Sequence, residues 1–326
     1  MRNVKWYCLL FFECALFIAN AQVINNTASF RNINGNSYFR LYYENDFFTA
    51  TDYYYSQGIN LEYVHPGLKK ITPVKVLLHL RKSAIKYGLS VEHDAFTPTS
   101  IRHPEVIPDD RPFAATLSAK SFVIALDSLK QQRTSASLSV GVIGSNAGGE
   151  WMQKSIHKWL KNIEPLGWEN QIHNDFILNY TFEYEKKIIA SNHFFLLNSY
   201  SKLCAGTLND NAGTGFSLMI GHFYSPFKKT NNTVNSQKKL WFHFYTQPVI
   251  SLIGYDATLQ GSLFNHTSPY VIAESKITRV TFQNNYGVTL TFKHIYLEYF
   301  QSVITKEFST GIYHRWGGIR IGIDLS

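Results

Sequence analysis

The sequence predicts an all-β protein: a transmembrane antiparallel β-barrel of about twelve strands, with a short helix in an outer loop. Apolar and polar residues alternate at a period of two along most of the chain. Aromatic residues are abundant, with 24 Phe, 20 Tyr and 6 Trp, as in the aromatic girdles of membrane barrels. After residue 21, no segment has the roughly 18 consecutive apolar residues that a membrane-spanning helix needs.

The alternating segments have one apolar face and one face of small or charged residues. Clear examples are 176–185 and 319–326. A soluble sandwich would bury the apolar face against a second sheet, whereas a membrane barrel would turn it toward lipid. Periodicity alone leaves both open. A secretory signal pattern in residues 1–21 favours the membrane barrel. Charges such as Glu183 and Arg320 on the non-apolar face also favour it. A terminal strand that can close the sheet adds to this.

The strand count has a topological consequence. Strand-like segments begin near Tyr38, Tyr54, Lys86, Phe113, Ser135, Asp175, His193, Gly213, Lys239, Glu274, His294 and Tyr313. If the chain starts on the periplasmic side, the outer rim carries connections 45–53, 97–111, 144–174, 205–212, 252–272 and 305–312. The segments of unusual polar composition fall in the first three. Chemistry there implies a substrate in the outer leaflet.

The N-terminus has the pattern of a secretory signal peptide, 1–21. Basic Arg2 and Lys5 precede an apolar stretch, and Ala19-Asn20-Ala21 is a small-x-small cleavage site. Residues 22–326 then form a single barrel domain. Cleavage leaves Cys204 as the one cysteine, so the domain must be stable without an intramolecular disulfide.

The charge is basic but scattered, with a formal net charge of +8. The basic pairs in the connections are either solvated surface or contacts to anionic lipid headgroups. No motif indicates nucleic-acid binding, which would also be unusual for an exported protein. We therefore expect outer-membrane lipids as partners, and a monomer.

The segment Glu44–Gly58 combines carboxylates, an amide and a hydroxyl among aromatic residues. Asn45 and Asp46 either form a turn or supply oxygen ligands for Ca²⁺. Asp52 and Ser56 would extend such a set, although Asp52 could simply cap a turn.

The third outer connection contains a predicted helix, Gly149–Asn162. Gln153 and His157 share one face of it. His157 is either a surface histidine or a general base, since histidine titrates near neutral pH. In the second connection, Arg102 is either simply exposed or contacts an anionic phosphate, and 109–112 is most simply a turn with its own ion pair.

Several motifs together resemble those of the outer-membrane lipid A 3′-O-deacylases, the LpxR family. In order along the chain they are Glu44-Asn45-Asp46 with Thr51–Gly58, then Pro108–Ala114, then Gly141–Gly144 with Ala147-Gly148-Gly149, Gln153, His157, Gly167-Trp168 and Gln171, and finally Tyr255–Gly261. Their order and spacing cover the whole chain after the signal segment.

The resemblance implies a Ca²⁺-dependent deacylase that removes the 3′ acyloxyacyl group of lipid A in lipopolysaccharide. His157 would activate water, Asn45 and Asp46 would lie at the metal, and Ser56 stands where the family has a threonine hydroxyl. Arg102, Gln153 and Asp52 would contact substrate. The family glutamate six residues after the histidine is replaced by Ile163.

Three alternatives remain open at this point. An outer-membrane phospholipase would need a serine nucleophile. A non-enzymatic barrel for adhesion or transport needs no catalytic group. A periplasmic β-sandwich would show the same alternation.

Overall fold

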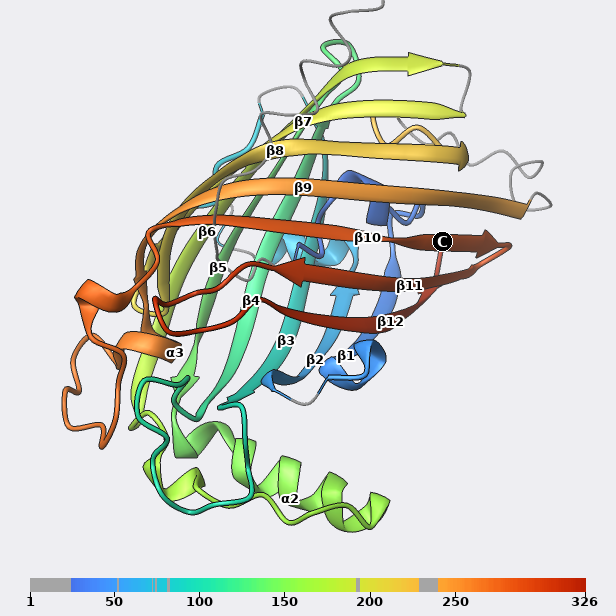
Figure 1. Cartoon of the computed structure of the whole chain (residues 1–326). Coiled ribbons are helices and arrows are strands. Elements are labelled where there is room, and N and C mark those ends of the chain that lie inside the picture. Colours follow the sequence, from blue (N-terminus) through green and yellow to red (C-terminus); the bar gives the residue numbers. More distant parts are fainter. Residues whose placement is uncertain are drawn as a thin grey trace, which may run out of the picture.

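The computed structural model describes residues 25–51, 53–71, 73, 75–80, 83–191, 194–228 and 240–326. It is a closed antiparallel barrel in which each strand pairs with its neighbours in sequence (Figure 1). The first and last strands close the barrel, with Tyr38 opposite Asp324. The strands are β1 (Tyr38–Asn45), β2 (Tyr54–Val64), β3 (Ala84–Thr97), β4 (Ala114–Asp127), β5 (Gln132–Ile143), β6 (Asp175–Ser191), β7 (Phe195–Gly206), β8 (Asn209–His222), β9 (Leu240–Asp256), β10 (Val280–Phe292), β11 (Ile295–Ile304) and β12 (His314–Asp324).

Short helices lie in the connections. None of the helices in the described residues is long and apolar enough to cross a membrane. They are η1 (Ser29–Arg31), η2 (Asp46–Thr49), η3 (Pro66–Lys70), η4 (Ser145–Ala147), α2 (Gly149–Leu160), η5 (Trp168–Asn170), α3 (Ala257–Gln260) and η7 (Glu274–Lys276).

The predicted barrel of about twelve strands with a helix in an outer loop is confirmed. Tyr38, Tyr54 and Asp175 begin strands as expected. The largest error is at β10, which begins at Val280 because Glu274–Lys276 form η7 instead. Two predicted strand starts, at 193 and 239, and the predicted signal peptide 1–21 lie outside the described residues.

The two faces of the wall divide as the alternation predicts. Outward side chains are apolar and exposed, for example Leu61 at 46%, Val140 at 53% and Ile321 at 44%. Inward side chains are polar and buried, and Arg320 bonds both Glu44 at 2.6 Å and Glu298 at 3.1 Å. This apolar-out, polar-in division is that of a barrel surrounded by lipid.

The loop 109–112 differs from its prediction. The expected ion pair within the turn is wrong, because its charged groups pair with other loops. Arg111 is buried and bonds Glu307, while Asp109 pairs with Lys276. These contacts join the second outer connection to the last two outer connections.

Candidate functional site on the outer wall

Helix α2 stands on the outside of the barrel wall. Outward-facing Ala95 and Ala115 are fully buried, and they form a cluster with Ala147 and Trp168. Small residues are needed here: a Cβ on Gly149, the first residue of α2, would lie 2.5 Å from the Cβ of Ala115. The base of α2 therefore packs directly on β3 and β4, and in Figure 1 the helix runs out along the rim below them.

His157 lies in the last turn of α2 and is held by the chain that follows the helix. Lys161 ends the helix in the left-handed conformation, with φ at 54°, which turns the chain back. The carbonyl oxygen of Ile163 then lies 2.6 Å from Nδ1 of His157. Because a carbonyl can only accept a hydrogen bond, Nδ1 carries the proton and Nε2 presents a lone pair.

A polar patch lies on the same outer face of the wall, at the ends of β1–β3. We call it the outer-wall patch and define it as Asn45, Ser56, Gln57 and Thr97. A β-bulge between Tyr55 and Gln57 turns the Ser56 side chain to the outer face. The extra residue of a bulge changes the direction in which the neighbouring side chain points. Ser56 Oγ is thereby 2.7 Å from Thr97 Oγ1, which belongs to the outward-facing set of β3.

Asn45 ties the patch to the loop. Its Oδ1 accepts from the Phe47 N–H at 2.7 Å and caps η2, and its Nδ2 donates to the Ser56 carbonyl. Asp46 follows as the first residue of η2, with its side chain buried. An acidic group at a helix N-terminus is stabilised by the unpaired N–H groups there.

Sheet register joins the patch to the base of α2. Gln57 lies opposite Ala95, and Ala95 packs in the cluster that supports Gly149. His157 is eight residues further along the helix, which is about 12 Å along its axis. The structure thus places Asn45, Ser56 and the base of α2 on one lipid-facing area of the wall. The hydrogen bond of the His157 ring goes to Ile163.

The predicted substrate-contact residues have different surroundings. Gln153 is buried, and its Oε1 accepts from Trp168 Nε1 at 2.7 Å. Arg102 is exposed on the second outer connection. Asp52 lies outside the described residues. Substrate contact by these three residues stays a prediction.

Helix α2 carries an ion pair between residues four positions apart, Glu150 and Lys154. Glu150 and Lys154 are 2.9 Å apart, and this hydrogen bond raises the pKa of Lys154. Both side chains are more than a third exposed, so the pair contributes little to stability.

Sequence reasoning missed two polar residues on the lipid-facing side, His93 and Thr97, whereas Gln57 belongs to the segment Glu44–Gly58 that it singled out. Gln57 and Thr97 are each 2% exposed, and His93 is 6% exposed. The alternation along β3 could have identified both missed residues. His93 and Thr97 are an even number of residues from Val91, whose side chain is exposed on the outer face, so they face outward too. A histidine at a lipid-facing position indicates that protein covers it there.

A calcium ion takes roughly six to eight oxygen ligands. Among the described residues, no group of three or more His, Cys, Asp and Glu side chains is placed to hold a metal ion. The Asp46 carboxylate and the Asn45 amide oxygen are the donor types that calcium prefers. They fit in chemistry and supply part of a shell, which backbone, water or substrate oxygens would have to complete.

The cap by Asn45 predicts a difference between two small substitutions. Asn45→Ser keeps a side-chain oxygen for the Phe47 N–H, whereas Asn45→Ala removes it. We expect Asn45→Ala to be less stable than Asn45→Ser by about 0.5–2 kcal/mol, measured by urea unfolding of the refolded barrel. Equal midpoints for the two variants would show that the cap does not hold the loop.

Taken together, the closed wall, its apolar exterior and its rim helix define an outer-membrane β-barrel protein. The family model described as "Outer membrane protein LpxR" matches residues 7–325. The chain therefore belongs to the LpxR family, as the sequence motifs indicated.

A solved structure with a TM-score well above 0.5 shares this fold. LpxR from Salmonella typhimurium superposes with a TM-score of 0.71 at 18% identity, over 89% of this chain and 100% of that one. The β domain of the Bordetella autotransporter BrkA covers 90% of this chain and 100% of its own, with a TM-score of 0.45 and 7% identity. No curated protein matches the chain at a significant level.

Proposed function

We propose that this chain is a calcium-dependent outer-membrane esterase that removes an acyl group, the 3′-acyloxyacyl chain, from lipid A in the outer leaflet. The observation that carries the proposal is the orientation of His157 on a helix that stands on the lipid-facing wall. A substrate held by its acyl chains in the outer leaflet reaches this face of the barrel without entering the lumen.

His157 is suited to act as the general base. The Ile163 carbonyl fixes the tautomer, so Nε2 can take a proton from water as the water attacks the ester carbon. The resulting imidazolium still donates from Nδ1 to the same carbonyl, and its Nε2 returns the proton to the departing sugar oxygen as the ester C–O bond breaks, which releases the fatty acid. In the family pattern a glutamate side chain stands at this position of the sequence. Here the backbone oxygen of Ile163 orients the ring, and a side-chain carboxylate is not needed for that role.

Asp46 and Asn45 would hold calcium, and when bound the ion would stabilise negative charge on the ester oxygen as a Lewis acid. Ser56 is less suited to be a nucleophile, because its hydroxyl is engaged with Thr97 at 2.7 Å. A serine mechanism would require a base within reach of that hydroxyl. The described hydrogen bonds of Ser56 include none to histidine, and this favours activated water over a phospholipase-type serine.

The test is mass spectrometry of lipid A from cells with and without the protein, grown with calcium or with a chelator. We expect loss of one acyloxyacyl group only when both protein and calcium are present. Unchanged lipid A in calcium-replete cells would contradict the proposal. Hydrolysed glycerophospholipid with intact lipid A would favour the phospholipase alternative.

A further inference from the structure

A described segment ahead of β1, residues 25–31, lies inside the barrel rather than outside it. Residues Asn25–Arg31, which we call the N-terminal plug, are buried except for Thr27, which is half-buried. The plug reaches the lumen from the end of the barrel at which β1 begins. It is composed largely of polar residues, as a segment enclosed by a polar lumen must be.

Hydrogen bonds tie the plug to strands all around the barrel. Thr27 Oγ1 is 2.8 Å from Ser135 Oγ and also bonds Glu183. The Ser29 N–H donates to Glu185 at 2.9 Å. Further bonds to the plug come from Asn198, His243, Arg40 and Arg320. With Glu298, the partner of Arg31, included, the strands contacted are β1, β5, β6, β7, β9, β11 and β12.

Arg31 is the main anchor. Its Nε donates to Glu298 on β11 at 2.9 Å, and its Nη1 donates to the Asn25 carbonyl at 2.6 Å. The side chain is nearly fully buried, as is that of Glu298. Beside it, Phe30 stacks on Tyr245 with ring centroids 4.0 Å apart. The buried ion pair with Glu298 ties the plug to β11, and the bond to the Asn25 carbonyl holds the two ends of the plug together.

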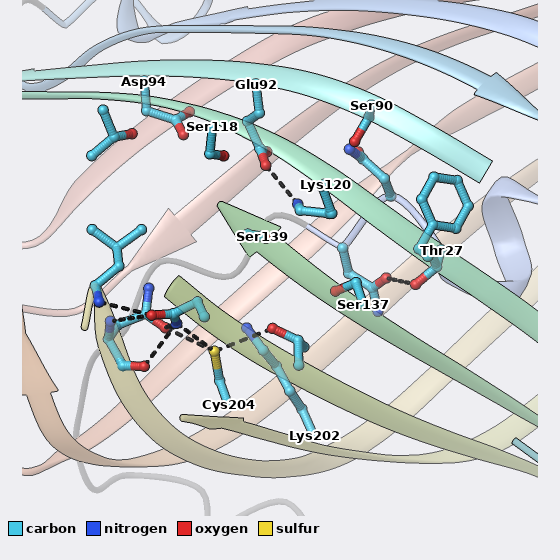
Figure 2. A pocket seen from close by; sticks show the side chains of 18 of the residues that line it. Thr27, Ser90, Glu92, Asp94, Ser118, Lys120, Ser137, Ser139, Lys202 and Cys204 are labelled. Carbon is cyan, nitrogen blue, oxygen red and sulfur yellow. Dashed lines mark hydrogen bonds and ion pairs between the residues drawn. The ribbon is translucent and has the colours of Figure 1, made fainter. Parts of the chain in front are cut away.

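The plug forms one side of a cavity of about 170 Å³ in the lumen. Figure 2 shows Thr27 at this cavity, with Lys120 bonded to Glu92 and Lys202 beside Cys204. The lining continues to Asp256 and Thr258 at the rim. Asn25, Asn26 and Thr27 of the plug line this polar space.

We propose that the N-terminal plug seals the lumen, so that the barrel conducts no ions although its interior is polar. A polar lumen with fixed charges would otherwise admit water and ions. The inference is independent of the proposed hydrolysis, since it concerns the inside of the barrel and the outer-wall patch lies outside.

The test compares single-channel conductance of refolded protein in planar bilayers. Deletion of residues 25–31 is expected to produce resolvable single-channel current steps, which the silent full chain lacks. Because the deletion could prevent folding, Arg31→Met is the second variant. Glu298 then keeps its bond to Arg320, and we expect intermittent openings as the plug loosens.

Lys202→Met is the matched control, since Lys202 also lines the cavity. Within the described part of the chain, no hydrogen bond or ion pair joins it to the plug. It should stay as silent as the full chain. Heat-modifiable mobility on gels verifies folding of each variant. A folded deletion variant that stays silent would overturn the proposal, as would equal conductance in Lys202→Met and Arg31→Met.

Discussion

Replacing His157 with alanine is expected to lower lipid A deacylation by about 10²–10⁴-fold, the usual loss on removal of a general base. The barrel itself should fold normally. His157 lies in the last turn of a rim helix, and its ring bonds one loop carbonyl. Initial rates on purified lipid A, beside heat-modifiable mobility on gels, measure the two effects separately.

Ile163 provides the matched control. Its carbonyl oxygen, not its side chain, accepts from His157, so Ile163→Ala keeps the hydrogen bond and should stay within about threefold of the full rate. Retention of full activity in His157→Ala would remove His157 as the base. A loss in Ile163→Ala as large as that in His157→Ala would show that the side chain at this position has its own role.

The architecture was predictable because its cause repeats in every strand. Alternation at a period of two marks both faces of the wall, and the positions of Glu183 and Arg320 in the lumen follow from it. The end of α2 was also close to its prediction, at Leu160 rather than Asn162. Strand starts near loops were less certain, since η7 replaces the predicted start of β10.

The details of the site depended on features that carry no side-chain signature. The partner of His157 is a backbone oxygen, which sequence motifs cannot display. Ser56 faces outward because of a one-residue bulge, and period-two parity alone would place it inside. The composition of the N-terminal plug predicted no position for it relative to the barrel. Only tertiary contacts, such as that of Arg31 with Glu298, place it in the lumen.

Replacing Arg320 with methionine is expected to destabilise the barrel by about 3–5 kcal/mol, the usual cost of leaving a buried charge uncompensated. Arg320 is 1% exposed and lies 2.6 Å from Glu44. Glu298 would retain Arg31 at 2.9 Å, but Glu44 would lose its ion pair. The guanidinium also lies over the Phe300 ring, 4.3 Å from its centroid. Urea unfolding of the refolded barrel measures the change.

Lys154→Met is the control, because it removes a cation from a pair of similar length, 2.9 Å, on the exposed face of α2. We expect a loss of only about 0.3–0.5 kcal/mol there. The contrast isolates burial as the cause. Glu44 lies near the end of β1, directly before Asn45 and Asp46. Arg320→Met should therefore also lower activity, because it loosens that strand end. Adding Glu44→Gln to the Arg320→Met chain should restore part of the stability. An Arg320→Met barrel as stable as the Lys154→Met barrel would refute the role of this lumen pair.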